Sequence, residues 1–544
     1  MRTRTLSMFA LFAPSILALA CHRTPAPATA GAGPAPARSA AALDIAYRIA
    51  MPEPAEHLYV VELSIGNVTS DVLELQLPVW SPGRYARFDF ARNVQDFTAE
   101  AGGRAVRWEK VNGSLWRLYP GGARSIRVRY RVFANDLSGT FSVLDTAHAN
   151  WNGASLFMYV EGHKQDPVRL HIEPPTGWRV INGDARTNDQ VDYTFENYDR
   201  LIDTPTEIAP AFMVDSFRVD GRLYRTMVHH NGPVNPTTRQ RFVRDVERLV
   251  RYENTVFGPP PLEMYTFLFN LGYQGSDGME HLYSTQIQST RPWADTAVML
   301  SGISTAAHEY FHVWNVKRVR PIVLGPFDYT REQYQPSLWV AEGWTQYYGT
   351  VAPYRTGIIG KGDFYASMAN GVFRPNLTAP GRKEVSARMA SFHAPFWDGS
   401  RPEYQNNGRI VFFSYYTKGA GLASVLDLMI RGSSGNARSL DDAARNLKRL
   451  SWDQPNASYY LQGRGYTEAD VEHAVSEAMG RDMHDWFERY VGGTDDPPID
   501  EALALAGLKL VRSASAWSLE EMPDATAAQR AVREGWLTGK TAGA

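Results

Sequence analysis

Two histidines and a glutamate lie at a spacing that suits metal-dependent hydrolysis. His308-Glu309-Tyr310-Phe311-His312 is an H-E-x-x-H motif. On an α-helix, residues four apart share one face, so both imidazoles can reach a single metal ion. Glu309 lies about one hundred degrees round the helix from His308 and can contact a water on that metal. The alternative is a buried helix turn with two ordinary core histidines.

A catalytic zinc ion also needs a third protein ligand and an open coordination position. One known arrangement places a histidine six residues after the second, behind a glycine, but Arg318 and Asn315 occupy those places here. The other arrangement takes a glutamate from a following helix, and Glu342 offers it. Burying this acid in so apolar a segment is costly without a cation. The alternative partner for Glu342 is one of the basic residues that follow the motif.

This residue set predicts one catalytic Zn²⁺ ion held by His308, His312 and Glu342. Zinc lowers the pKa of a bound water to about 7, and Glu309 would take its proton as general base during attack on a peptide carbonyl. The oxyanion that develops needs a second donor besides zinc.

The elements that must position these residues follow from sequence periodicity. Residues 126–132 alternate apolar and basic, and residues 73–79 alternate in a similar way, as strands with one buried face do. Beyond about residue 236 the pattern favours helices. The predicted helices span residues 237–256, 303–316, 336–348, 415–431, 439–450 and 467–490. Ser304 and Thr305 are candidate caps for the motif helix.

These patterns predict a multidomain α+β protein. An N-terminal antiparallel β domain (43–205) is expected to precede the catalytic domain (206–375), and a helical C-terminal domain (376–510) follows. Residues 511–544 show no convincing pattern and are expected to form a tail.

The amino terminus predicts export. Arg2 and Arg4 precede a mostly apolar run too short to span a bilayer, which is typical of a secretory signal at residues 1–20. Cys21, the single cysteine, resembles the lipidated cysteine of a bacterial lipobox, and ordinary signal cleavage is the alternative. The rest of 21–42 is an Ala/Pro-rich flexible linker. We expect a periplasmic or envelope protein whose membrane contact is a lipid on Cys21.

The overall charge excludes one class of partner. The 544 residues carry a formal net charge of −2, and the pI is about 6.7. A nucleic-acid-binding protein would leave a basic footprint. Nucleic acid is therefore not an expected partner.

The motif and several further phrases resemble the glycyl aminopeptidase family of zinc metallopeptidases. The phrases are DGMEH (277–281), HEYFHVWNVKRVRP (308–321), LWVAEGWTQYYG (338–349) and YYTKG (415–419). LPVWSPGRY, SLFMYVEG, LIDTPTEIAP and RYVGGTDDPP extend the resemblance over about residues 42–510. It implies a thermolysin-like zinc peptidase domain, peptide substrates with a free amino terminus, and removal of small N-terminal residues such as glycine or alanine.

The resemblance also implies substrate contacts. Glu280 would bind the substrate's α-amino group, and Gly278 and Met279 would line the same wall. Tyr416 would donate its hydroxyl to the oxyanion, with its neighbour Tyr415 as the alternative. Because this carboxylate would lie at a fixed distance from zinc, the bond placed at the metal would be the one that follows the first residue.

Two features depart from the family pattern. Asp277 stands where the family usually has glycine, which leaves a preference for glycine open. Only about 35 residues follow Leu510, too few for the C-terminal PDZ module that many relatives carry. Several residues without an assigned role are expected to be solvated: the basic run Lys317, Arg318 and Arg320, and the pair His229 and His230.

Two other functions stay open at this point. One is a zinc endopeptidase of the same fold, in which Glu280 serves another purpose. The other is a catalytically silent peptide-binding envelope lipoprotein. The intact set of metal ligands and Tyr416 argues against a silent protein, which would have no need to keep Glu309.

Overall fold

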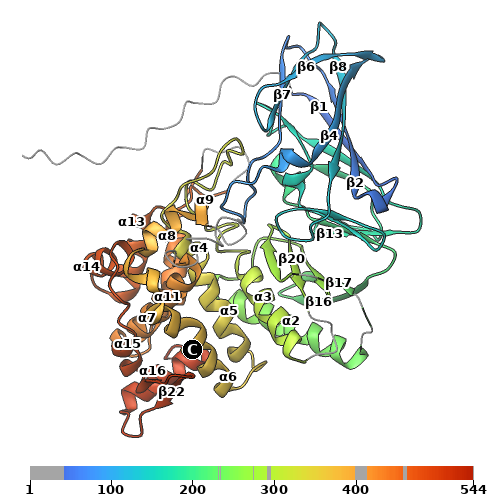
Figure 1. Ribbon diagram of the computed structural model, residues 1–544. Coiled ribbons are helices and arrows are strands. Elements are labelled where there is room, and N and C mark those ends of the chain that lie inside the picture. The colour runs from blue at the N-terminus through green and yellow to red at the C-terminus, as the bar shows by residue number, and fades with distance from the viewer. Residues whose placement is uncertain are drawn as a thin grey trace, which may run out of the picture. The chain divides into compact units, whose positions relative to one another are not determined.

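The first part of the chain folds into strands, as its alternating pattern predicts. The computed structural model describes residues 42–230, 232, 235–273, 275–290, 296–397, 413–456 and 462–542. The expected signal at 1–20, Cys21 and the linker up to residue 41 lie outside the described residues. In Figure 1 the blue-to-green part of the chain is mainly strands, and the yellow-to-red part is mainly helices.

The N-terminal strands form three sheets within the described residues. Their orders are β14-β12-β1-β2-β8-β4-β5, β13-β15-β10-β9 and β11-β3-β7-β6. The strands are β1 Asp44–Ala50, β2 Leu58–Gly66, β3 Leu73–Gln76, β4 Val94–Ala101, β5 Arg104–Ala105, β6 Arg107–Lys110, β7 Leu115–Tyr119, β8 Ser125–Phe133, β9 Val143–Leu144, β10 Ala149–Trp151, β11 Tyr159–Val160, β12 Val168–Glu173, β13 Arg179–Asn182, β14 Asp192–Phe195 and β15 Thr206–Ala209. A short helix, α1 Tyr198–Ile202, precedes β15.

Strand β8 shows why these residues form a half-buried sheet. Its apolar side chains Ile126, Val128, Tyr130 and Val132 are buried, and the residues between them are exposed or half-buried. This is the period-two pattern of a strand with one face on the core. The domain is not purely antiparallel, because β1 pairs with β12 in parallel. More than a hundred residues separate these two strands, so the crossover that a parallel pair requires is available.

After the three N-terminal sheets, a five-stranded sheet, called the second sheet below, begins at Met213. Its order is β16-β17-β18-β20-β19, with parallel pairs at β17/β18 and β18/β20. The strands are β16 Met213–Val219, β17 Arg222–His230, β18 Met264–Leu271, β19 Asp277–Glu280 and β20 Ser284–Ser289. The expected boundary at residue 205 falls just before β15, which still pairs with β10 and β13 of the N-terminal part.

The rest of the chain is mainly helical, as predicted. Helices α2 Pro236–Phe257 and α3 Thr296–Phe311 belong with the second sheet, and α3 contacts β19 and β20. The later helices are α4 Leu338–Ala341, α5 Gly343–Arg355, α6 Lys361–Ser367, α7 Arg374–Thr378, α8 Ala387–Phe392, α9 Ala394–Trp397, α11 Tyr415–Ser433, α12 Leu440–Leu450, α13 Glu468–Met479, α14 His484–Phe487, α15 Ile499–Leu505 and α16 Ala527–Thr538, with π-helical segments at Met368–Phe373 and Glu488–Gly492. The expected boundary at residue 375 falls inside α7.

The motif helix starts and ends earlier than predicted. Helix α3 begins at Thr296, so Ser304 and Thr305 lie inside it and do not cap its start. It ends at Phe311, one residue before His312, and the chain then turns. No helix in the described part of the chain is long and apolar enough to cross a membrane.

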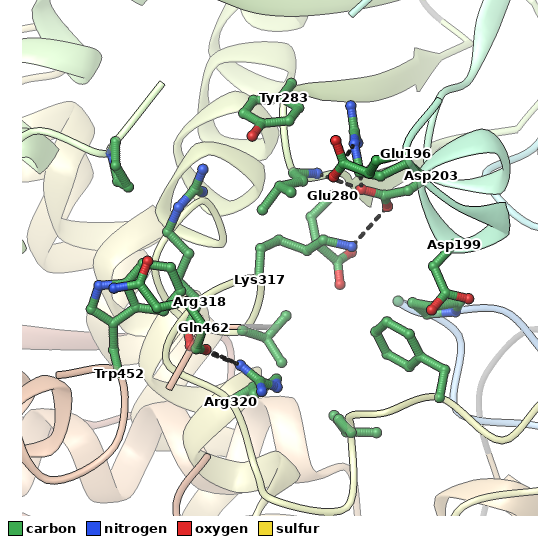
Figure 2. Close-up of a pocket in the computed structure, with 18 of the residues that line it drawn as sticks. Glu196, Asp199, Asp203, Glu280, Tyr283, Lys317, Arg318, Arg320, Trp452 and Gln462 are labelled. Carbon is green, nitrogen blue, oxygen red and sulfur yellow. Dashed lines mark hydrogen bonds and ion pairs between the residues drawn. The ribbon is translucent and has the colours of Figure 1, made fainter. Parts of the chain in front are cut away.

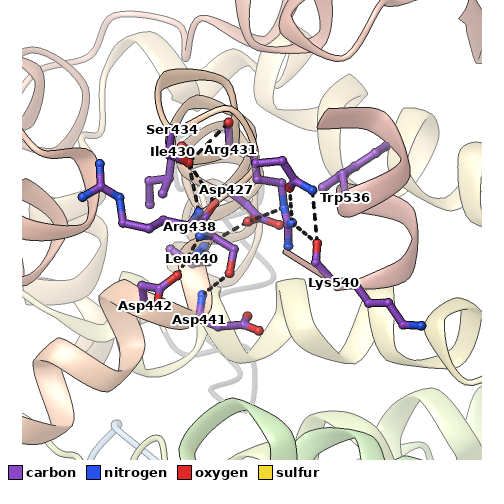
Figure 3. A network of polar contacts seen from close by, with 12 residues as sticks. Asp427, Ile430, Arg431, Ser434, Arg438, Leu440, Asp441, Asp442, Trp536 and Lys540 are labelled. Atoms are coloured by element: carbon purple, nitrogen blue, oxygen red, sulfur yellow. Dashed lines mark hydrogen bonds and ion pairs between the residues drawn. The ribbon is translucent and has the colours of Figure 1, made fainter. Parts of the chain in front are cut away.

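The C-terminal residues are folded, and the expectation of a tail without pattern is wrong. Strands β21 Leu508–Arg512 and β22 Trp517–Glu521 form a hairpin, and α16 follows. Trp536 of α16 is fully buried and donates through Nε1 to the Tyr347 hydroxyl of α5 at 3.0 Å. Arg431 donates to the Lys540 carbonyl at 2.9 Å and pairs with Asp427, as Figure 3 shows. These contacts fix the C-terminal elements against the helices. The two strands have five residues each, which is too short to give a clear periodic pattern in the sequence.

Candidate metal centre and active site

Three side chains from two segments meet at one point. His308 lies in α3, His312 follows its last residue, and Glu342 stands between α4 and α5. The two Nε2 atoms are 3.1 Å apart, and Glu342 Oε2 is 3.4 Å from His308 Nε2 and 3.2 Å from His312 Nε2. Ligands about 3.3 Å apart are what a tetrahedral ion with bonds of about 2.0–2.1 Å requires. The donor set therefore fits zinc.

The burial and charge of these side chains also fit a cation. His312 and Glu342 are each 1% exposed, and His308 Nδ1 and Glu342 Oε2 are buried without a hydrogen-bond partner among the described atoms. Burial alone would lower the pKa of His312, but Glu342 and Glu280 raise it to about 10. The carboxylates around this point thus favour positive charge, which a divalent ion supplies.

The basic run does not neutralise Glu342, and the expectation that it is solvated is wrong. Arg318 and Arg320 are each 2% exposed. Arg318 donates to the Val313 carbonyl, and Arg320 to the Gln462 carbonyl at 3.0 Å. Lys317 Nζ pairs with Asp203 at 2.8 Å. Among the described residues, the ion pairs of Glu342 are with His308 and His312. The salt-bridge alternative for Glu342 is therefore not what the geometry favours.

Two residues that sequence reasoning missed orient the ligands. Tyr85, from the loop after β3, donates its hydroxyl to Glu342 Oε1. The Asn315 carbonyl accepts from His312 Nδ1 at 2.6 Å, and Asn315 Nδ2 donates to the carbonyls of Val340 and Ala341 at 3.0 and 3.2 Å. Such outer partners fix the orientation of ligating side chains. Tyr85 lies in the phrase LPVWSPGRY and Asn315 in HEYFHVWNVKRVRP, both of which resemble the family. The resemblance gave no role to either residue.

Glu309 lies against the edge strand β19. Its side chain is 5% exposed, and a Cβ added at Gly278 would stand 2.0 Å from Glu309 Oε1. Only glycine lets the strand approach the carboxylate this closely. Burial raises the pKa of Glu309, and Glu280 and Glu342 add to this while His312 opposes it. Such an environment favours a carboxylate that takes up a proton readily.

Glu280 at the end of β19 faces the same point. Ligand atoms of Glu280, Glu309 and His312 all lie within 4.8 Å of one another. Glu280 is 3% exposed, and its Oε1 is buried without a hydrogen-bond partner among the described atoms. Gly83, at φ +90°, comes so close that a Cβ there would be 2.8 Å from Glu280 Oε2. Met279 is fully buried beside it.

A cavity of about 260 Å³ adjoins Glu280. Glu280, Gly83 and Tyr85 line it together with charged residues from several elements. Figure 2 shows Glu280 near the paired Lys317 and Asp203 on one side, with Arg320 and Gln462 further along the wall. Among its lining residues, Tyr85 and Glu280 also contact or face the candidate metal centre, whereas His308, His312 and Glu342 do not line the cavity.

Asp277 does not stand free in the site. It forms an ion pair with Arg84 and accepts from the Gly139 backbone N–H at 2.8 Å. Arg84 also donates to the Gly278 carbonyl at 3.0 Å. The acid that replaces the family's usual glycine therefore attaches the edge strand to the N-terminal part of the chain.

The two candidate tyrosines have different surroundings. Tyr416 is half-buried, and its ring stacks on that of His308 at a centroid distance of 5.9 Å. Tyr415 is 2% exposed and packs edge-to-face against Tyr85 at 6.2 Å. The helix that carries both passes close to α5, since a Cβ at Gly343 would be 2.3 Å from the Gly419 Cα. This arrangement favours Tyr416 over Tyr415 as the residue that faces a substrate.

Comparison with solved structures finds an aminopeptidase N family protein from Idiomarina loihiensis. It is 27% identical, with a TM-score of 0.77 over 86% of this chain and 79% of that chain. An M1 zinc metallopeptidase from Deinococcus radiodurans is 14% identical, with a TM-score of 0.48 over 85% and 96%. A mutant of that enzyme bound to a Tyr-Ser-Ala substrate gives 14% and 0.49 over 84% and 96%. Both of these TM-scores are below 0.5, so the likeness of this chain to the Deinococcus enzyme supports no inference. A search of the curated proteins finds no match.

Two family models match the chain in order. The Peptidase M61 N-terminal domain matches residues 46–210, and M61 glycyl aminopeptidase matches residues 301–422. Together they cover more than half of the chain, and the N-terminal match ends one residue after β15. The expected α+β architecture and the family resemblance are thereby confirmed. The chain belongs to the M61 glycyl aminopeptidase family and is a peptidase.

Proposed function

We propose that the protein is an exported, zinc-dependent aminopeptidase that removes small N-terminal residues, glycine or alanine, from peptides. One observation carries the aminopeptidase assignment. The buried carboxylate of Glu280 lies within 4.8 Å of ligand atoms of Glu309 and His312. A buried carboxylate needs a cationic partner, and the α-ammonium group of a peptide is one. An endopeptidase substrate brings no such group to this point.

His308, His312 and Glu342 are the residues that would hold the zinc ion. Zinc, when bound, lowers the pKa of a coordinated water to about 7 and polarises a carbonyl. Glu309 accepts the proton of the attacking water, and its burial, which raises its pKa, favours the protonated form. It then delivers the proton to the leaving amine.

The remaining groups position the peptide. Glu280 holds the α-ammonium group and so sets the first peptide bond against Glu309, which makes the cleaved unit a single residue. The Tyr416 hydroxyl donates to the carbonyl oxygen as negative charge develops on it. Gly278 and Met279 line the wall beside the amine. The preference for small residues is supported by the family that the chain belongs to.

Export is proposed from the amino-terminal sequence. Residues 1–20 have the charge and length of a secretory signal, and Cys21 follows them at the position of a lipid-bearing cysteine. We place the mature protein in the bacterial periplasm or envelope, held there by a lipid on Cys21. Labelling with a radioactive fatty acid, compared between wild type and Cys21→Ser, tests the anchor.

Paired peptides test the reaction itself. Zinc-loaded protein is given alanyl and glycyl peptides, each free and N-acetylated, with Glu309→Gln as the blank. Cleavage of the free-amine peptides alone is the expected result. Glu280→Gln should then raise KM for the free peptides far more than it changes zinc content.

Two other outcomes would overturn the proposal. Equal cleavage of acetylated peptides would make the protein an endopeptidase and remove the role of Glu280. Binding of peptides without cleavage, with zinc present, would identify a catalytically silent envelope protein.

A further inference from the structure

A second group of metal-ligating side chains lies away from the active site. His148 directly precedes β10, Glu207 is in β15, and His229 is in β17. The relative exposures are 1%, 0% and 7%, so the expectation that His229 lies on the surface is wrong. Strands β10 and β15 belong to the N-terminal part, and β17 belongs to the second sheet. The cluster therefore joins two sheets.

Its geometry resembles that of the catalytic cluster. Glu207 Oε1 is 3.0 Å from His148 Nδ1 and 3.0 Å from His229 Nδ1, and the two Nδ1 atoms are 3.2 Å apart. The corresponding distances among His308, His312 and Glu342 are 3.1–3.4 Å. Both triangles match the separation of about 3.3 Å between ligands of a tetrahedral zinc ion.

The surrounding groups hold the ligands as an outer shell would. Asn150 and Asn270 donate their Nδ2 to Glu207 Oε2 at 3.0 and 3.3 Å, which leaves Oε1 directed at the two imidazoles. The Tyr273 hydroxyl lies 3.2 Å from His229 Nε2 and 3.4 Å from His229 Nδ1, so it contacts both nitrogens of this ring. Hydrogen bonds to the second oxygen of a ligating carboxylate are a usual support of a metal site.

Hydrogen bonding alone accounts for this arrangement less well. If both Nδ1 atoms carried hydrogens, two donors only 3.2 Å apart would point at one oxygen, and their partial positive charges would repel. If one Nδ1 accepted from the other and both imidazoles were neutral, the buried carboxylate would have one donor on Oε1 and the two asparagine donors on Oε2, but no cation, which is costly. A divalent ion bound by both nitrogens and Oε1 removes both difficulties.

We propose that His148, Glu207 and His229 bind a second divalent transition-metal ion, with zinc as the matching species. Two imidazoles and a carboxylate are donors that suit zinc. The ion would tie β10 and β15 to β17 and so fix the N-terminal part, which supplies Gly83 and Tyr85 to the active site. This inference does not depend on the proposed peptidase reaction.

A row of paired residues in the second sheet links the proposed ion site to the active site. His229 pairs with Asn270, Asn270 with Gln288, and Gln288 with Asp277. Asp277 immediately precedes Gly278 and is fixed to Arg84 of the N-terminal part. The second ion would therefore join the N-terminal part to the second sheet at β17. The Asp277–Arg84 ion pair joins the same two parts at the edge strand β19.

Metal counting in a variant without the catalytic site tests the proposal. The double variant His308→Ala/His312→Ala is equilibrated with buffered free Zn²⁺, freed of excess metal and measured by mass spectrometry. Wild type should hold two ions per chain and the double variant one. Cobalt in the double variant should give the visible absorption of a tetrahedral ion, and zinc should raise its unfolding temperature.

Two further variants locate the ion. His229→Ala in the double-variant background should hold none, whereas His171→Ala, an exposed histidine paired with Asp192, should still hold one. A folded double variant that binds no zinc and shows no shift in unfolding temperature would overturn the proposal. An ion that persists after His229→Ala would equally overturn it. The count on the double variant decides the question even if His229→Ala fails to fold.

Discussion

Replacing Tyr85 by phenylalanine removes one hydroxyl and nothing else from the metal centre. Tyr85 is 4% exposed and donates to Glu342 Oε1, while Oε2 of the same carboxylate faces the two histidines. The hydroxyl thus fixes which carboxylate oxygen is presented to the metal. Because the loop after β3 supplies it, the N-terminal part helps to orient a candidate metal ligand.

The expected magnitude follows from the kind of hydrogen bond that is lost. A buried hydrogen bond to a charged group contributes about 1.5–3 kcal/mol. Since about 1.4 kcal/mol is tenfold in an equilibrium constant, Tyr85→Phe should weaken zinc binding about 10–100-fold. The range agrees with the effect of removing outer partners from other metal sites. At saturating zinc, turnover should recover to a large extent.

The assay is competition for zinc between the protein and a chromophoric chelator. The matched control is Tyr47→Phe, because Tyr47 is equally buried and donates to the Met158 carbonyl at 2.6 Å in the β domain. That variant should lose about 1 kcal/mol of unfolding free energy and keep its zinc affinity. If Tyr85→Phe bound zinc as tightly as wild type, the assignment of its hydroxyl to Glu342 orientation would be refuted.

Three further predictions concern the same region. Tyr416→Phe should lower kcat about 10²–10³-fold with zinc content unchanged, and steady-state kinetics showing the loss in Tyr415→Phe instead would move the role by one residue. Asn315→Ala removes the side-chain hydrogen bonds to the segment before Glu342. It should weaken zinc binding about 10–100-fold, measured by chelator competition. Unaltered zinc affinity would show that these hydrogen bonds are not needed to position Glu342. Burial alone would raise the pKa of Asp203, but Lys317 lowers it below its usual value. The stabilisation from this ionised carboxylate is present above its unfolded pKa of about 4 and is lost as pH falls. In metal-free protein, the free energy of unfolding in urea should be higher for wild type than for Asp203→Asn, and this difference should become smaller below about pH 4. A difference that stays constant with pH would contradict the prediction.

The sequence predicted that His308 and His312 lie side by side, because their spacing is local. Residues four apart on a helix share a face whatever the rest of the fold does. Glu342 was found by a different signal, an acid in an apolar segment, and it lies against both histidines. The alternating strands and most helices were also predicted, since periodicity reports which face is buried.

Other expectations were wrong where burial depends on distant partners. Arg318, Arg320 and His229 are buried because groups from far along the chain lie against them: the Tyr283 ring, the Gln462 carbonyl and the Glu207 carboxylate. The residues after Leu510 fold because Trp536 fits against α5. No local pattern records such partners.

The sequence by itself thus determined the peptidase family, the pair of imidazoles and the acid between them, since one helix turn sets their geometry. Only the tertiary structure placed Glu280 beside His312, and only it showed Tyr85 on Glu342 and Asn315 behind His312. It alone brought together His148, which precedes β10, Glu207 of β15 and His229 of β17. The physical reason is that these contacts arise where separate sheets and helices pack, and packing joins residues whose separation in the chain carries no periodic signal.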